Sequence, residues 1–351
     1  MMERSGVATK TPHGVHSNMT DFPRSSPTIG IAMAAYQAAD TIGATLRAIL
    51  AQSRPPARTV VVIDGPDPDT EEVVRAFGPE IECLVLPQNT GGPGGPRNAA
   101  VTHLRASGDV DAYCFFDADD IPYPRFLEVA TDLMIRHPEC PIIYTGFDFW
   151  HPPEDPPTPE GSMGSVHPWT LEDYLEHSGL KLLSFSLIRS DSCRTVRASG
   201  LPFDPELRRN QDYDLTVRLL AEAPAMATDW RGAAYRILST SHSASGVDAW
   251  LSRLLATESL GRYFNASDRQ ELVAMMDRYA GSGLRRAARH LWIRGNAGDR
   301  RAALRLLLDD VVKRRDPRSV AVLLTLGLGV DVKAARMSAR DHRKIGRSKP
   351  G

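Results

Sequence analysis

Three carboxylates that stand close together in the sequence carry the clearest chemical signal. Asp117, Asp119 and Asp120 follow an apolar run predicted as a strand over 111–116, and no basic residue separates them. Clustered carboxylates repel one another, so their pKa values rise unless a cation neutralises them. Oxygen ligands suit Mg²⁺ or Mn²⁺, which also bind phosphate oxygens. The pattern indicates a divalent-cation site, and an acidic, solvated turn is the alternative.

Two other segments could contact a ligand. Asp64 ends a β-branched run and could accept hydrogen bonds from a ribose hydroxyl or a base nitrogen, although an Asx turn explains it equally well. Residues 88–98 are rich in glycine, so their backbone could approach a ligand, and Arg97 could hold a diphosphate. This segment lacks the Lys-Ser/Thr end of a Walker A loop and does not open the first helix as G-x-G-x-x-G would. A flexible loop is the alternative.

A further carboxylate, Asp212, stands before an apolar helical face. It could act as a general base that removes a proton from a hydroxyl. It could equally be a cap of the helix that is predicted to begin near Gln211. Local sequence supports both interpretations.

The predicted elements bring these groups together. Strand-like apolar runs alternate with helical spacing; the strands are predicted over 28–36, 58–65, 80–86 and 111–116, and the helices over 41–52, 71–77 and 97–106. This alternation indicates a parallel sheet covered on both faces, whose ligands bind outside the carboxyl ends of the strands. We therefore expect Tyr36, Asp64 and Asp117 to share one edge of the sheet with the glycine-rich segment.

The second half of the chain becomes helical. A strand is predicted over 182–188, and residues 152–159 are rich in proline and acidic residues, as in a loop or a lid. Beyond residue 246 the apolar spacing is helical throughout, and Ser267-x-x-Gln270 has the pattern of a capping box.

The net charge of −1 conceals a strong asymmetry. Residues 246–351 carry 22 Lys and Arg against 11 Asp and Glu, a net charge of +11, so the rest of the chain has a net charge of −12. An acidic body of this kind argues against a uniformly basic nucleic-acid-binding protein.

The composition, 42% hydrophobic and 24% charged, is that of a globular protein. The four cysteines form no CxxC pair, so neither a zinc site nor a disulfide scaffold is indicated. No apolar run reaches the roughly 18–20 residues that span a bilayer, and residues 1–27 lack a signal-peptide core. A cytoplasmic location is expected.

Taken together, these segments resemble glycosyltransferase family 2. The resembling segments, in order, are Ile31 to Gln37, Val62 to Thr70, Asn89 to Asn98, Phe116 to Asp120 with Pro122, Pro124 and Phe126-Leu127-Glu128, and Gly200 to Leu215. No single motif is decisive, but five in the same order are specific, and they lie within residues 28–245.

The resemblance implies an α/β protein with the GT-A fold, which is Rossmann-like with a mostly parallel central sheet. It also implies a division of the chain into a disordered leader (1–27), a GT-A domain (28–245), a C-terminal helical appendage (246–335) and a basic tail (336–351).

The resemblance also implies roles for the candidate residues. Those expected to bind a nucleotide-diphosphate sugar are Ala34, Tyr36, Asp64, Arg97, Asp117 and Ala118. Tyr36 and Asp64 would contact the base and the ribose, and Arg97 would lie near the diphosphate. Asp119 would bind Mn²⁺ or Mg²⁺, with Asp120 and His242 as further possible ligands. Asp212 would be the catalytic base of an inverting displacement.

The chain departs from the family pattern at three points. Ala34 replaces a proline, which is expected to be tolerated. Gln211 replaces the glutamate before the base, which removes a carboxylate from the acceptor site. The Tyr235-Arg236 pair lacks the histidine that usually follows it, and His242, which stands a few residues later, could bind metal or simply lie in a surface loop.

The function implied is metal-dependent transfer of a sugar, with a UDP-sugar as the commonest donor in the family. The acceptor is a glycan, a lipid-linked molecule or a small molecule. Trp150, Trp169 and Gln211 are candidate acceptor contacts, although core packing also explains the tryptophans. The basic tail could contact anionic lipids at the inner face of the membrane, or be a solvated helical face.

Two alternatives remain. A nucleotidyltransferase usually has a glycine-rich basic loop after its first strand, whereas this chain has Ala34-Ala35-Tyr36-Gln37 there. A non-catalytic nucleotide-sugar-binding protein would have a decayed site, whereas Asp117, Asp119 and Asp212 are all present.

Overall fold

The computed structural model describes residues 26–108, 110–158, 164–177, 182–237, 247–294 and 297–327. Within these ranges, nine strands form one sheet, in the order β3-β2-β1-β4-β8-β6-β9-β5, with β7 paired to β9. The strands are β1 (Ile29–Ala35), β2 (Arg58–Ile63), β3 (Glu82–Val85), β4 (Ala112–Cys114), β5 (Ile121–Pro122), β6 (Ile142–Trp150), β7 (Val166–Trp169), β8 (Ser186–Arg189) and β9 (Ala225–Arg236).

The sheet is mostly parallel, as the sequence predicts. The strands β1 to β4 pair in parallel, and β6 and β9 run in the same direction because β8 pairs antiparallel with both β4 and β6. Only β5, β7 and β8 run the opposite way among the described strands. The carboxyl ends of β1, β2, β4, β6 and β9 therefore lie along one edge of the sheet.

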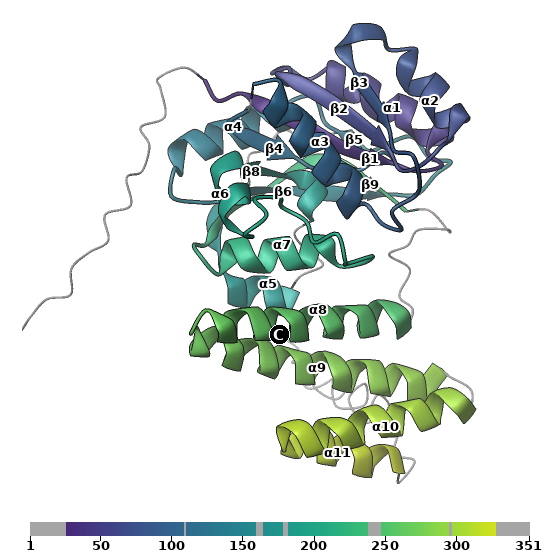
Figure 1. The fold of residues 1–351 in the computed structure, drawn as a ribbon, viewed down its shortest axis with the longest axis vertical. Coiled ribbons are helices and arrows are strands. Elements are labelled where there is room, and N and C mark those ends of the chain that lie inside the picture. The colour runs from purple at the N-terminus through teal and green to yellow at the C-terminus, as the bar shows by residue number, and fades with distance from the viewer. Residues whose placement is uncertain are drawn as a thin grey trace, which may run out of the picture.

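Helices cover both faces of this sheet (Figure 1). They are α1 (Ala39–Leu50), α2 (Pro68–Arg75), α3 (Gly94–Ala106), α4 (Phe126–Arg136), α5 (Leu171–His177), α6 (Ser190–Thr195) and α7 (Gln211–Leu220). Alternate residues of β1 and β2 point to opposite faces: Ile31 and Val61 pack in one core with α1 and α4, and Ala32 and Val60 pack in another with α3 and α7. Continuous apolar strands bury both faces in this way.

Most predicted elements agree with the structure in type, and several boundaries differ. The strand predicted over 182–188 begins only at Ser186, after a 3-10 turn over Leu183–Phe185. The strand predicted over 111–116 pairs only at Ala112–Cys114: its ladder with β8 ends at Tyr113 and its ladder with β1 ends at Cys114. Phe115 and Phe116 leave the ladder and enter the two opposite cores. The helix predicted near Gln211 does begin at that residue. The capping box is wrong, because the Ser267 hydroxyl donates to the Tyr263 carbonyl of the preceding helix, 3.0 Å away.

Four helices follow the sheet: α8 (Val247–Ala266), α9 (Gln270–Arg294), α10 (Ala297–Arg314) and α11 (Pro317–Gly327). Figure 1 shows α8 and α9 stacked beneath α7, with α10 and α11 beyond them. None of the described helices is long and apolar enough to cross a membrane.

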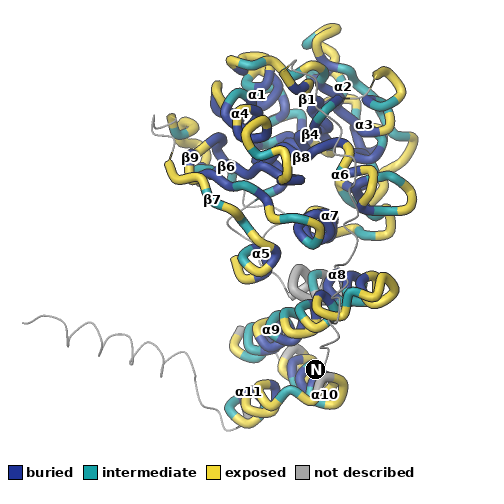
Figure 2. The backbone as a smooth tube through the Cα atoms, turned by 90° about the vertical axis from the view of Figure 1, so that its left-hand side faces the viewer, coloured by how far each residue is buried: buried dark blue, intermediate teal, exposed yellow. Residues whose placement is uncertain are grey.

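The first of these helices is part of the main core. Leu260 and Phe264 of α8 and Met276 of α9 are buried in the same hydrophobic cluster as Tyr213 of α7. The outer helices have a small core of their own, around Leu307 and other residues of α9, α10 and α11. Figure 2 shows many exposed residues along α10 and α11. The helical region therefore begins as an extension of the α/β core. The boundary predicted at 245/246 and the tail 336–351 lie outside the described residues.

Candidate active site

The polar residues predicted on one edge of the sheet do lie there. Tyr36 directly follows β1 and its side chain is 53% exposed. The backbone N–H of Asp64, just after β2, donates to the carbonyl of Ala35 at 2.8 Å. Asp117 follows β4, on the other side of β1. The strand order reverses between β1 and β4, and such switch points form ligand crevices in open α/β sheets.

Asp117 is held by two other elements. Arg97 of α3 forms an ion pair with one carboxylate oxygen, and Ser184 donates to the other at 2.5 Å. Arg97 is itself buried, with its guanidinium 5.5 Å from the ring centre of Phe203, and its Nε has no hydrogen-bond partner in the described part of the chain. The residue predicted to lie near the diphosphate, Arg97, is thus directly paired with Asp117, which is predicted to bind the sugar donor.

The next two carboxylates lack such neutralisation. Burial and the nearby charge of Asp117 raise the pKa of Asp119 to about 6. Asp120 is fully buried, and burial together with both neighbouring aspartates raises its pKa well above the usual value. One oxygen of Asp120 accepts a hydrogen bond from the Arg236 backbone N–H at 2.9 Å, and the other has no partner among the described residues. Negative charge is therefore concentrated here beyond what the described residues neutralise.

These carboxylates fit a divalent cation such as Mg²⁺, which takes few of its ligands from the protein. Within the described ranges, no three His, Cys, Asp or Glu side chains converge as a complete protein cage. Mg²⁺ typically needs only one or two carboxylates, because phosphate oxygens and water supply the remaining ligands. With Asp117 already paired to Arg97, Asp119 is the carboxylate best placed for such an ion, and Asp120 is too enclosed to present both oxygens. His242 lies outside the described residues.

Asp64 positions the glycine-rich segment. Its buried carboxylate accepts hydrogen bonds from the Thr90 backbone N–H at 2.8 Å and from the Thr90 hydroxyl at 2.9 Å. The Asn89 side chain donates to the Asp64 carbonyl at 3.1 Å. Gly65 has φ +98°, and a Cβ there would stand 2.8 Å from the Asn89 nitrogen. The carboxylate predicted to contact the nucleotide therefore also fixes the loop beside it.

The glycines of this loop allow a close packing contact. A Cβ on Gly92 would stand 2.5 Å from the Arg208 carbonyl oxygen, too close for any side chain. It would also meet Gln211, which is buried and donates to the Leu207 carbonyl at 2.7 Å. Helix α3 then begins at Gly94. The structure places Gln211 against this loop, and its role toward an acceptor stays a prediction.

Asp212 lies on the first turn of α7, which starts after Asn210 in the left-handed conformation (φ 61°). Its neighbours Gln211 and Tyr213 are buried, whereas Asp212 is exposed. Burial raises the pKa of Tyr174, and the nearby charge of Asp212 raises it further. Within the described part of the chain, no side chain forms an ion pair or hydrogen bond with the Asp212 carboxylate. An unpaired carboxylate on a fixed helix suits a group that must accept a proton.

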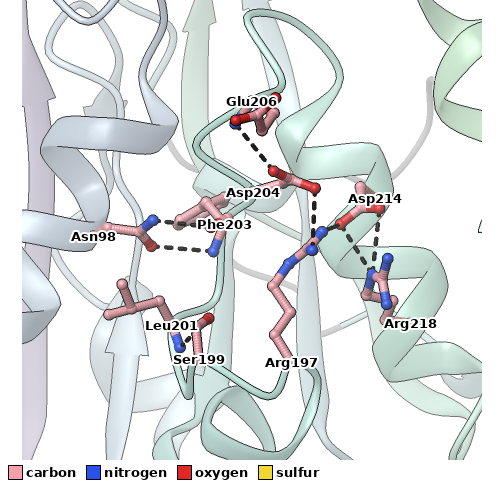
Figure 3. A network of polar contacts seen from close by, with 9 residues as sticks. All are labelled: Asn98, Arg197, Ser199, Leu201, Phe203, Asp204, Glu206, Asp214 and Arg218. Atoms are coloured by element: carbon pink, nitrogen blue, oxygen red, sulfur yellow. Dashed lines mark hydrogen bonds and ion pairs between the residues drawn. The ribbon is translucent and has the colours of Figure 1, made fainter. Parts of the chain in front are cut away.

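Two residues further on, Asp214 has the opposite environment (Figure 3). It is 1% exposed and forms ion pairs with both Arg197 and Arg218, the latter with Nε at 3.1 Å from Oδ2. Arg197 also binds Asp204 at 3.1 Å. Sequence reasoning missed this network. The i,i+4 spacing of Asp214 and Arg218 was its one local signal.

The two tryptophans lie in different settings: Trp150 ends β6 at the edge that carries the carboxylates, whereas Trp169 stands opposite Ala225 at the start of β9. The Trp150 indole N–H donates to the Glu154 carbonyl at 2.6 Å, and the Arg236 guanidinium covers its ring at 3.9 Å from the centre. Trp169 ends β7 and packs against the core beside His167 and His177. Contact of either ring with an acceptor stays a prediction. Ala34 lies near the end of β1, and the carbonyl of Ala118 accepts from Thr45 of α1 at 3.1 Å.

Comparison with known structures identifies the architecture. Crystal structures of TarS from S. aureus align with a TM-score of 0.60 and 16% identity, over 84% of this chain and 50% of the TarS chain. The chain thus spans about half the length of that relative. TarS 1–349 in complex with UDP-GlcNAc aligns with a TM-score of 0.62 and 17% identity, over 85% of this chain and 84% of that one. Its complex with UDP aligns with a TM-score of 0.60 and 17% identity, over 92% and 93%.

Comparison with curated proteins gave no significant match. The family model described as Glycosyl transferase family 2 matches residues 30–197, which contain the sheet edge and its carboxylates. The resemblance seen in the sequence is confirmed over residues 30–197, which match the family model, and the chain has the GT-A fold.

Proposed function

We propose that the protein transfers a sugar from a nucleotide-diphosphate sugar to a hydroxyl acceptor, with inversion at the sugar carbon and with help from a divalent cation. The observation that carries this proposal is the grouping of Asp119 and Asp120 with Asp117 directly after β4, at the switch point of a family 2 fold. A uridine nucleotide is the expected donor, since TarS structures of the same fold contain UDP and UDP-GlcNAc.

The residues divide the work along the sheet edge. Tyr36 and the loop fixed by Asp64 would bind the base and the ribose. Asp119 would hold the cation against the diphosphate, where the ion stabilises the negative charge of the leaving group. Arg97, which lies beside Asp117, supplies a further fixed positive charge near the diphosphate.

Asp212 would serve as the base. It accepts the proton of the acceptor hydroxyl while that oxygen attacks the sugar carbon, and the bond from this carbon to the diphosphate breaks with its electron pair leaving on the diphosphate oxygen. Because one displacement occurs at the carbon, its configuration inverts. An exposed, unpaired carboxylate is free to accept a proton in this way.

Calorimetry with UDP, GDP and TDP, each with and without Mn²⁺, tests the binding step. We expect UDP to bind, with markedly higher affinity when Mn²⁺ is present. A coupled assay for UDP release from a panel of UDP-sugars then tests the reaction, and EDTA should suppress it until Mn²⁺ or Mg²⁺ is restored. Absence of nucleotide binding would favour a non-catalytic protein, and full turnover in EDTA would refute the role of the cation.

Contact of the basic tail with anionic lipid also stays a prediction. Residues 336–351 lie outside the described residues, so its support is the net charge of +11 over 246–351. Sedimentation with vesicles of anionic and of neutral lipid, with and without the tail, tests it. Binding that is unchanged by removing the tail would contradict the prediction.

A further inference from the structure

Arg236, the last residue of β9, is attached to the carboxylate cluster at two points. Its backbone N–H donates to Oδ1 of Asp120 at 2.9 Å, and its Nε donates to the backbone carbonyl of Asp119 at 2.7 Å. Asp120 reaches β9 because β5, which begins at the next residue, pairs antiparallel with β9. The guanidinium of Arg236 is therefore fixed beside the residue proposed to hold the cation.

The terminal nitrogens of this guanidinium have no protein partner in the described part of the chain. No hydrogen bond or ion pair joins Nη1 or Nη2 to a described residue, and Arg236 is only partly buried. Arg97, the other arginine proposed to lie near the diphosphate, is buried and already paired with Asp117. Of the two, Arg236 thus has the more accessible N–H donors, and their planar arrangement matches the oxygens of a phosphate group.

Trp150, the last residue of β6, covers one face of the same guanidinium. The two residues stand opposite each other in the parallel pairing of β6 and β9, so their side chains leave the sheet on the same side. The guanidinium carbon lies 3.9 Å from the centre of the Trp150 ring, which is a cation–π contact. The indole N–H donates to the Glu154 carbonyl at 2.6 Å, so the ring is itself fixed.

The burial of Trp150 makes it a support for Arg236 instead of a surface for a ligand. A sugar that stacks on an indole needs an open ring face, whereas Trp150 is 7% exposed and packs with Tyr123 in a small cluster. An arginine side chain is flexible, and holding it in advance lowers the entropy that is lost when it binds a phosphate. The ring of Trp150 therefore acts on a ligand through Arg236.

We propose that Trp150 is a positioning residue, which by stacking on Arg236 holds the Nη1 and Nη2 groups ready for the diphosphate of the donor. Since that donor is the one in the proposed glycosyl transfer, the inference rests on the proposed function. It gives Trp150 a role toward the donor, where the sequence indicated an acceptor contact.

A double-mutant cycle on UDP binding by the full chain tests this role. The variants are Arg236→Ala, Trp150→Leu and their combination; Trp150→Met is a second variant without the ring, and Trp150→Phe keeps an aromatic face. Calorimetry measures UDP with Mg²⁺, and ligand-observed NMR measures uridine, which has no phosphate. Trp292→Leu is the matched control, because Trp292 is partly buried against the small core of the outer helices.

We expect UDP affinity to fall about ten-fold in Arg236→Ala and about five-fold in Trp150→Leu and Trp150→Met. It should stay within about two-fold of the wild type in Trp150→Phe and Trp292→Leu. The combined variant should bind UDP no more than about two-fold more weakly than Arg236→Ala, because the ring acts through the arginine. Uridine binding should be the same in all these proteins.

Three results would overturn the inference. One is UDP affinity that Trp150→Leu and Trp150→Met leave unchanged, and another is a five-fold loss that persists when Arg236 is already absent. The third is a parallel loss of uridine binding, which would show that the ring only supports the fold. In each case UDP still binds the wild type and the proposed function stands. A wild type that does not bind UDP would refute the proposed function, and the inference with it.

Discussion

Two sets of buried carboxylates in this protein have opposite surroundings. Asp214 on α7 lies between two arginines, so its charge is neutralised within the fold. Asp119 and Asp120 after β4 face another carboxylate, and their pKa values are raised. A buried charge with a built-in partner is largely compensated within the fold, whereas one without a partner is costly until a ligand neutralises it. The comparison separates acids that are ion-paired within the fold from acids that are not, which look alike in the sequence.

The largest effect is expected on turnover, from substitution of Asp212, the proposed base. Asp212→Asn should lower turnover by roughly 10²- to 10⁴-fold, the usual range for loss of a general base. UDP affinity and the free energy of unfolding should change little, because the side chain is exposed. UDP-release kinetics and calorimetry on the same sample measure both. A variant that turns over normally would disprove the assignment of the base.

Asp214→Asn should lower the free energy of unfolding, which Asp212→Asn should leave almost unchanged. It leaves Arg197 and Arg218 facing each other without their shared carboxylate, and Arg218 is fixed against the Tyr263 ring, 3.9 Å from its centre. Removing one partner of a buried ion pair costs about 3–5 kcal/mol. Urea unfolding followed by circular dichroism measures this, with Asp212→Asn as the matched control on the same helix turn. Equal stability of the two variants would break the comparison.

Asp119→Asn should stabilise the cation-free protein. Folding raises the pKa of Asp119 from 3.8 to about 6, so ionised Asp119 weakens the fold at pH 8. The variant should then be about 2–3 kcal/mol more stable at that pH. This difference should shrink as the pH falls from about 6 toward 3.8 and vanish below it, because both states are then protonated. Urea titrations in EDTA at pH 8 and pH 4 measure it, and a wild type as stable as the variant at pH 8 would show that ionised Asp119 does not weaken the fold.

The smallest effect concerns Asp64, an intermediate case whose carboxylate has hydrogen bonds but no ion pair among the described residues. Thr90→Val removes the hydroxyl donor and keeps the backbone one, so the expected loss of stability is about 1–2 kcal/mol. Thr195→Val, at an exposed helical position, is the control and should change stability by less than about 0.5 kcal/mol. A loss as large as that of Asp214→Asn would show that Asp64 belongs with the fully neutralised acids.

Much of the fold could be predicted from the order of the residues. Apolar runs such as 58–65 and the helical spacing between them indicate parallel strands with crossover helices, because a strand buried on both faces must be apolar throughout. The positions of Asp64 and Asp117 after such runs were enough to place both on one edge of the sheet. Where the pattern failed, as at Phe115 and Phe116, the pairing with β1 and β8 ended before the apolar run did, and no local signal reports where pairing with a distant strand ends.

The sequence by itself determined the resemblance to glycosyl transferase family 2, the GT-A fold and which acidic residues stand at strand and helix ends, since these depend on local patterns and their order. Only the tertiary structure decided how the charges are shared. It paired Arg97 with Asp117, enclosed Asp214 between two arginines, and left Asp119 and Asp120 without an ion pair among the described residues. It also joined Phe149 to Tyr235 across β6 and β9 and merged α8 into the core. These contacts link residues far apart in the chain, and the balance of charge and burial that they create exists only once the chain has folded.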